Sequence, residues 1–204
     1  MARGRGLSNL TRLDLHNSEV GDEGLAALVA FPNFPRLTRL ELMSCRIGDE
    51  GVRALASSPH LRNLTHLDLS ANEFTDEGVG ALAATSNLPE LATLALGSEN
   101  VTDHGACAIA ASGNLPKLTR LSLFGNQITD EGVRVIAASP HLSGVHELRL
   151  ASNQITDAGA RVLAASTSFR QLNTLDLRDT KITAEGTRAL AESANLDSVE
   201  DLRV

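Results

Sequence analysis

A leucine pattern recurs along the chain at a constant interval of 27 residues. Each copy contains the run Leu-x-x-Leu-x-Leu or a close variant of it, as at Leu118, Leu121 and Leu123. The eight copies open at Leu10, Leu37, Leu64, Leu91, Leu118, Val145, Leu172 and Val199, with no insertion or deletion between them. One copy is too short to bury its apolar face alone, so neighbouring copies must stack and share a continuous core.

Each copy predicts a short strand followed by a helix. The spacing of the leucines is typical of a strand with one buried face. Every complete copy then carries a glycine followed by a stretch of helical composition, such as Val52 to Ala56. The predicted helix N-caps are Thr75, Thr102, Thr129, Thr156 and Thr183, with Gly21 and Gly48 in the first two copies.

The stacking of these units predicts the overall shape. Neighbouring strands lie about 4.8 Å apart, whereas packed helices lie about 8–10 Å apart, so the stack must curve with its strands on the inside. We therefore predict an α/β solenoid over residues 1–204, a single domain of seven 27-residue repeats plus a final strand. Parallel strands form the concave face of this horseshoe, and helices form the convex face.

The segments Leu118 to Ile128 and Val145 to Ile155 resemble the leucine-rich-repeat signature, Leu-x-x-Leu-x-Leu-x-x-Asn-x-Ile. The following Thr-Asp-Glu-Gly-Val-Arg run is similar to the ribonuclease-inhibitor-like subclass. Related repeats occur in NOD-like receptors, Ran GTPase-activating protein and bacterial GALA-type effectors. The resemblance covers essentially the whole chain. It implies the horseshoe fold and a role in binding proteins, although fold alone does not determine function.

The turn after each strand departs from the signature in several repeats. Asparagine is present at Asn72, Asn126 and Asn153, whereas the other turns carry Ser18, Cys45, Glu99 and Thr180. A buried asparagine would satisfy backbone groups of neighbouring turns, and serine, cysteine or threonine would replace it in part. Glu99 predicts a loose or rearranged turn in the fourth repeat.

The charge pattern limits the possible partners. The net charge is −7, but 11 of the 25 acidic residues fall in predicted first helical turns, where they favour the helix dipole. We prefer this interpretation to attraction of a basic partner, although the acids would still form a stripe along one rim. No basic stripe accompanies the repeat, so nucleic acid is not the expected partner. No apolar run reaches the roughly 18–20 residues that cross a membrane.

The location of the protein is predicted from its termini and thiols. No secretory signal is visible at the N-terminus, and Cys45 and Cys107 fall at different positions of different repeats. We expect two free thiols and a cytoplasmic protein, with a translocated effector as the alternative.

The side chains between the buried leucines are expected to point out of the concave face. These positions vary along the chain while the leucines do not, which fits a recognition surface, although mere exposure to solvent would explain the variation equally well. The predicted partner is a protein of unknown identity. The candidate binding residues are Arg12, Asp14, His16, Arg39, Glu41, Met43, His66, Asp68, Arg120, Phe124, Arg149 and Arg178.

Two features stand out on this predicted face. The fourth strand is bare, because its outward positions carry only the small residues Thr93, Ala95 and Gly97. Phe124 lies beside this bare strand, which predicts an anchor site for a partner. The alternative is a lone surface phenylalanine that its neighbours partly cover. The other feature is the lattice of opposite charges on the first three strands, for which self-pairing is favoured over partner contact.

A catalytic role is not predicted. His66, Asp68 and Ser70 share one strand face, but alternate residues lie about 7 Å apart, whereas a nucleophile and its base need about 2.6–3.2 Å. We predict no metal or cofactor site, because the chain lacks the usual ligand and phosphate-loop motifs.

The sequence is also compatible with two other roles. Regulation of a partner enzyme, as a GTPase-activating or effector protein, is an alternative by resemblance only. A spacer segment of a longer protein is the other. The uncapped ends predict possible end-to-end self-association.

Overall fold

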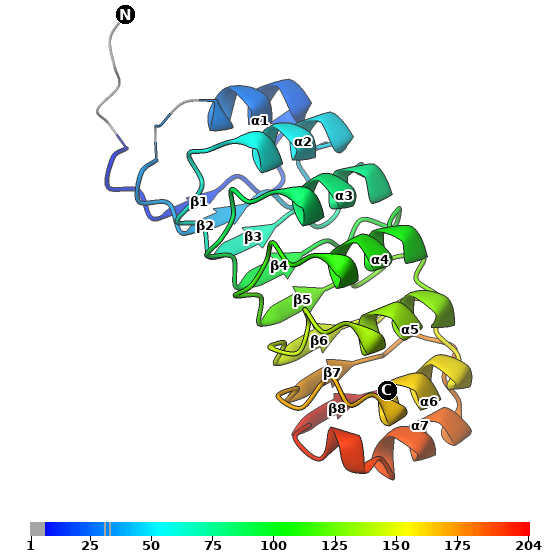
Figure 1. Ribbon diagram of the computed structural model, residues 1–204. Coiled ribbons are helices and arrows are strands. Elements are labelled where there is room, and N and C mark those ends of the chain that lie inside the picture. The colour runs from blue at the N-terminus through cyan, green and yellow to red at the C-terminus, as the bar shows by residue number, and fades with distance from the viewer. Residues whose placement is uncertain (1–6, 31, 33) are drawn as a thin grey trace, which may run out of the picture.

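The computed structural model describes residues 7–30, 32 and 34–204, and it alternates strands with helices along the chain (Figure 1). The strands are β1 (Arg12–Asp14), β2 (Arg39–Glu41), β3 (His66–Asp68), β4 (Thr93–Ala95), β5 (Arg120–Ser122), β6 (Glu147–Arg149), β7 (Thr174–Asp176) and β8 (Asp201–Arg203). The helices are α1 (Gly21–Val29), α2 (Asp49–Ser57), α3 (Asp76–Ala84), α4 (Asp103–Ala111), α5 (Asp130–Ala138), α6 (Asp157–Ala165) and α7 (Ala184–Ala191), and a 3-10 turn spans Ala194–Leu196.

The strands form one parallel sheet in chain order, from β1 to β8. Equivalent residues pair across every junction, as Leu13 pairs with Leu40 and Leu40 with Leu67. The helices form a second layer along one side of this sheet (Figure 1). The predicted α/β solenoid is therefore confirmed. No helix among the described residues has the length and hydrophobicity that spanning a membrane requires.

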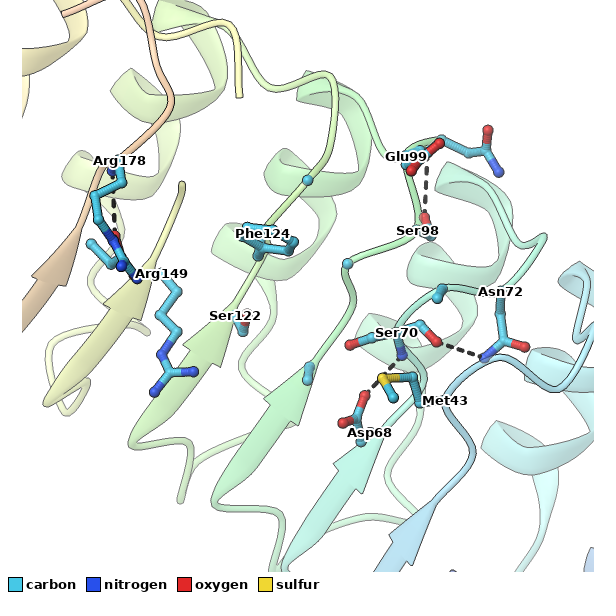
Figure 2. Close-up of a pocket in the computed structure, with 16 residues that line it drawn as sticks. Met43, Asp68, Ser70, Asn72, Ser98, Glu99, Ser122, Phe124, Arg149 and Arg178 are labelled. Carbon is cyan, nitrogen blue, oxygen red and sulfur yellow. Dashed lines mark hydrogen bonds and ion pairs between the residues drawn. The ribbon is translucent and has the colours of Figure 1, made fainter. Parts of the chain in front are cut away.

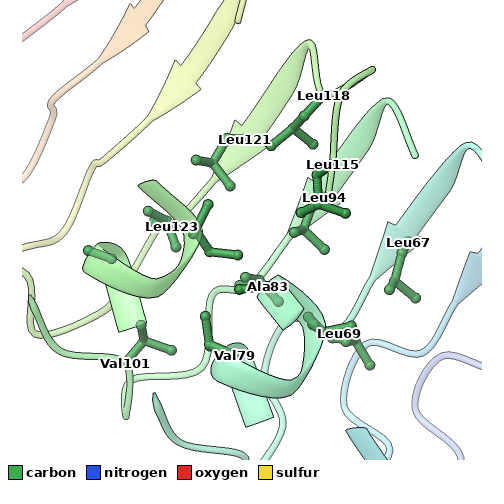
Figure 3. Packing of buried hydrophobic residues seen from close by; sticks show 14 of the residues in the cluster. Leu67, Leu69, Val79, Ala83, Leu94, Val101, Leu115, Leu118, Leu121 and Leu123 are labelled. Atoms are coloured by element: carbon green, nitrogen blue, oxygen red, sulfur yellow. The ribbon is translucent and has the colours of Figure 1, made fainter. Parts of the chain in front are cut away.

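The core lies between the two layers and is almost entirely aliphatic. Leu67 and Leu69 of one repeat are at most 1% exposed, and Val79 of the following helix is fully buried (Figure 3). Two phenylalanines, Phe74 and Phe169, are also fully buried in this otherwise aliphatic core. Burial of apolar surface along the whole stack supplies the main stabilisation.

The helix starts follow the prediction in five repeats. Each threonine hydroxyl accepts a hydrogen bond from the backbone two residues later, as Thr129 Oγ1 does from Glu131 N (3.2 Å). The prediction for Gly21 is wrong, because α1 begins at Gly21 and Val20 precedes it. Gly21 has a φ of 61° and donates its N–H to the Cys45 carbonyl, so it turns the chain rather than capping the helix.

The aspartates of the first helical turns have a second role that the sequence interpretation missed. Asp49 Oδ1 accepts hydrogen bonds from Thr75 N and Gly78 N, each 2.8 Å long, while Thr75 Oγ1 donates to Asp49 Oδ2. Each aspartate therefore holds the start of the next helix. The residues at this position are Asp22, Asp49, Asp76, Asp103, Asp130, Asp157 and finally Ala184.

This aspartate ladder also explains the glycine of every repeat after the first. A methyl group built on Gly105 would lie 2.5 Å from Asp76 Oδ1, and one on Gly159 would lie 2.5 Å from Asp130 Oδ1. Only glycine leaves room for the carboxylate of the preceding repeat.

A second ladder runs through the turn asparagines. Asn72 Nδ2 donates to the carbonyls of Leu42 and Leu69, while its Oδ1 accepts from Cys45 N and Ile47 N. Cys45 replaces only the donating half, because its Sγ donates to the Leu15 carbonyl. The prediction that a cysteine replaces the turn asparagine only in part is therefore confirmed at Cys45.

The turn of the fourth repeat is rearranged, as predicted from Glu99. In the regular turns, positive φ falls on the residue before the asparagine, such as Ala71 (55°) and Ser152 (56°). In the fourth repeat it falls on Glu99 itself (68°), which is exposed, while Ser98 is buried. The glutamate cannot enter the buried asparagine position, so the turn shifts by one residue.

Candidate functional site

The predicted site residues lie along one face of the sheet. Eight of them are the first or third residues of β1, β2, β3, β5 and β6, on either side of a core leucine: Arg12, Asp14, Arg39, Glu41, His66, Asp68, Arg120 and Arg149. The other four follow two residues after a strand: His16, Met43, Phe124 and Arg178. Because the strands pair in register, equivalent residues of neighbouring repeats stand side by side.

The charges of β1 and β2 pair with one another. Arg12 Nη2 lies 2.7 Å from Glu41 Oε2 and 3.2 Å from Asp14 Oδ2, and Arg39 Nη1 lies 3.2 Å from Glu41 Oε1. The backbone N–H of His16, followed by nearby charges, lowers the pKa of Asp14. The favoured self-pairing therefore occurs here, and such exposed pairs stabilise a fold only weakly.

His66, Asp68 and Ser70 do not form a catalytic relay. His66 Nδ1 lies 2.7 Å from Thr65 Oγ1, and Asp68 Oδ1 accepts from Ser70 N (2.9 Å) rather than holding the imidazole. Burial, then the charges of Arg39 and Arg120, lower the pKa of His66. The imidazole is therefore neutral at pH 7, and it contributes a polar ring rather than a charge to the sheet face.

A hollow of about 800 Å³ opens on the middle of the sheet face. Figure 2 shows Met43 and Asp68 on one side, Arg149 and Arg178 on the other, and Phe124 between them. The lining also includes residues that the sequence interpretation did not single out for binding: Ala71, Asn72, Ser98, Glu99, Asn100, Gly125 and Asp176. The departure of Glu99 from the turn signature was the one signal that could have pointed to this part of the lining.

The absence of large side chains on β4 creates this hollow. Ala95 and Gly97 occupy positions that carry Asp68 and Ser70 one repeat earlier. A methyl group built on Gly97 would lie 2.6 Å from the Phe124 carbonyl oxygen, so the close approach of these two turns requires glycine. Phe124 is 52% exposed and stands over this bare strand, as the sequence predicted.

The arginines beside the hollow are each bound to a carboxylate. Arg149 Nη2 lies 2.5 Å from Glu147 Oε1. Arg178 donates two hydrogen bonds to the Asp176 carboxylate, of 2.9 and 2.7 Å. These bonds lower the pKa of Asp176, although burial acts in the opposite direction. Asp176 is only 3% exposed, so it supports Arg178 rather than contacting solvent.

Ala151 departs from the expected exposure of the sheet face. It occupies the position in the sixth repeat that Phe124 and Arg178 occupy in the fifth and seventh, where an outward side chain is expected, but it is only 2% exposed. Its methyl group stands between two larger side chains of that column.

The predicted acidic rim is largely satisfied within the fold. Its aspartates are half-buried in the ladder that joins neighbouring helices. Several of its glutamates pair with arginine, as Arg161 does with Glu185 (2.5 Å) and Arg134 with Glu131. This rim therefore presents less free charge than its sequence suggests.

A curved stack of strand–helix repeats with an open, charged sheet face defines a repeat solenoid of the protein-interaction class. The chain belongs to the leucine-rich-repeat family, because the family model described as Leucine Rich repeat matches residues 6–29, 36–56, 60–83, 114–137, 143–164 and 170–191. The unmatched interval between the third and fourth segments contains β4 and Glu99. The repeat that forms the floor of the hollow is thus the one that departs from the family pattern.

Comparison with solved structures supports the fold. Internalin C2 from Listeria monocytogenes str. 4b F2365 is 23% identical, with a TM-score of 0.62 over 97% of this chain and 80% of the internalin chain. At this identity the likeness shows the fold alone. No curated protein matches the chain. The ribonuclease-inhibitor-like subclass stays a prediction.

Proposed function

We propose that this protein binds another protein through the concave face of its sheet, with the hollow around Phe124 as the anchor. The observation that carries the proposal is a half-exposed phenylalanine in a hollow of about 800 Å³, on a sheet face otherwise lined by charged side chains. Aromatic side chains in desolvated pockets dominate the energy of protein interfaces. Exposed apolar groups rimmed by polar residues are typical of binding sites.

The surrounding charges are proposed to select the partner. Paired surface charges such as Arg39 and Glu41 add little to stability. At an interface, such groups steer association and reject partners with the wrong charge pattern. The hollow therefore supplies affinity in this proposal, and the charged columns on β1 to β3 supply specificity.

The proposal is tested by capturing partners from lysate of the source cells with the wild-type chain, Phe124→Asp and Leu7→Asp. Leu7 is a matched control because it is also 52% exposed but lies before β1. Phe124→Asp should lose a partner that Leu7→Asp retains, with circular dichroism unchanged in both. A partner list unchanged by Phe124→Asp contradicts the proposal, and a chain that captures nothing favours the spacer role.

The role of the charged columns is tested separately with Arg39→Glu. Binding of the captured partner should weaken, and its dependence on salt should fall, because a steering charge has been reversed. Binding with unchanged affinity and unchanged salt dependence would remove β1 and β2 from the proposed interface.

A further inference from the structure

Two carboxylates that line the hollow form no ion pair among the described residues. Asp68 accepts one hydrogen bond, from Ser70 N (2.9 Å), and faces the methyl group of Ala95 on the next strand. Glu99 is exposed on the rearranged turn of the fourth repeat. The strand carboxylates elsewhere on the sheet face differ, because Asp14, Glu41, Glu147, Asp176 and Asp201 each contact an arginine.

The arginines of the hollow do not offset these two charges. Arg149 pairs with Glu147, which Arg120 also approaches at 3.4 Å, and Arg178 pairs with Asp176. Of the five charged residues in the lining, only Asp68 and Glu99 form no ion pair among the described residues. The side of the hollow formed by β3 and β4 therefore presents negative charge.

The apolar part of the hollow lies next to these carboxylates. Asp68 on β3 and Phe124 after β5 are two strand spacings apart across the sheet, about 9–10 Å, and Phe124 lies two residues further along its strand direction, with Ala95 and Gly97 between them. Figure 2 shows Met43 beside Asp68 and the Phe124 ring across the bare strand. A long side chain that lies over Ala95 and Gly97 has the Phe124 ring on one side and the Asp68 carboxylate on the other.

We propose that the hollow receives a basic side chain, arginine or lysine, from the protein partner. The aliphatic stem lies over Ala95 and Gly97 against the Phe124 ring, and the cationic head lies on the β3 and β4 side of the hollow, where Asp68 and Glu99 supply negative charge. Cations bind aromatic faces within about 6 Å of the ring centroid, and long basic side chains combine an apolar stem with a charged head. This inference rests on the proposed function and adds the chemistry of the partner.

An acidic partner is the competing possibility, because Arg149 and Arg178 also line the hollow. Binding a carboxylate there would require these arginines to release Glu147 and the buried Asp176 or to share them. Uncovering a buried, hydrogen-bonded carboxylate is costly. The unpaired charges of the hollow therefore favour a basic group.

The test is to pan a displayed library of random dodecapeptides against the wild-type protein, Phe124→Asp and the double variant Asp68→Asn/Glu99→Gln. Asparagine keeps the oxygen that accepts from Ser70 N, so the fold should be retained. The matched control is Glu23→Gln/Glu192→Gln, which removes two exposed charges on the helix side. Bound pools are sequenced, and affinities of synthesised peptides are measured.

Wild-type and control proteins should select peptides enriched in arginine or lysine. These peptides should bind the double variant about 9- to 25-fold more weakly, since a partly exposed ion pair contributes about three- to fivefold for each carboxylate. Peptides that need Phe124 but show no basic enrichment, or are acidic, overturn this inference and leave the proposed function standing. Pools insensitive to Phe124→Asp, or an absence of specific binders, overturn both.

Discussion

Single residues decide how closely the repeats approach one another. The carboxylate of each ladder aspartate occupies the space where a side chain would begin on the glycine of the next repeat, as for Asp76 and Gly105. The sequence made the recurrence of both residues visible. It could not show that they touch, because they are 29 positions apart and meet only after the repeats stack.

The Gly105→Ala variant should therefore destabilise the protein. The added methyl group would lie 2.5 Å from Asp76 Oδ1 and 2.6 Å from a Val101 methyl group, and overpacking of this kind costs about 1–3 kcal/mol. The control is Gly80→Ala in α3, where nothing lies within 4 Å, and where alanine should stabilise by about 0.5–1 kcal/mol. Urea unfolding measures both, and equal effects would contradict the ladder.

At the scale of the element, each helix start is held by the preceding repeat. Asp157 Oδ1 accepts from Thr183 N (2.7 Å) and Gly186 N (3.0 Å), and these bonds, with Thr183 N the largest cause, lower the pKa of Asp157. A carboxyl group with a lowered pKa in the folded state stabilises the fold above its unfolded pKa, near 3.8.

Acid should therefore weaken the start of α7. The contribution of Asp157 should be lost as pH falls through its folded pKa, so the free energy of unfolding should decrease below about pH 4. In Asp157→Asn this decrease should be smaller, because the titrating group is gone. Urea unfolding at several pH values from 6 to 3 measures the difference, and parallel curves for the two proteins would count against the ladder.

The turn of the fourth repeat is the element that the sequence predicted least completely. Glu99 indicated a rearrangement, but its form depends on how the backbone shifts, which places positive φ on Glu99 and buries Ser98. The sequence predicted the bare fourth strand, but it could not show that the shifted turn would place Glu99 in the lining of a hollow beside that strand.

Glu99→Asn should restore the asparagine ladder. A turn asparagine donates to carbonyls of its own repeat and the preceding one and accepts backbone N–H groups of the preceding repeat, as Asn72 and Asn126 do, so the new asparagine would join the third and fourth repeats. We expect the free energy of unfolding to rise by about 1 kcal/mol, the typical contribution of a net hydrogen bond. Thermal unfolding checks this, and a less stable variant would show that the shifted turn is the better arrangement for this repeat.

At the scale of the molecule, the 27-residue phase predicted nearly the whole architecture. Strand order, register and the aliphatic core all follow from equivalent residues stacking on one another, as Leu94 does on Leu121. The sequence also identified Phe124 and the bare strand. Ion pairing and the burial of Asp176 could not be predicted, because they depend on side-chain conformations across neighbouring strands.

The predicted end-to-end self-association remains a proposal. Leu202 on β8 is 36% exposed and Val204 is 44% exposed, and an open strand edge with apolar side chains favours pairing with another chain. Light scattering should show mass increasing with concentration in the wild type and less so in Leu202→Asp. A wild-type mass that stays monomeric at high concentration would contradict the proposal.

The central claim is that a protein partner contacts the concave face, and the free thiols allow a direct measurement. Cys45 is buried and Cys107 is exposed on α4, so a benzophenone maleimide labels the helix side of the native chain. In Cys107→Ser/Ser122→Cys the same label sits in the hollow. We predict that light crosslinks the captured partner to position 122 and not to position 107. Crosslinks from position 107 alone would contradict the account.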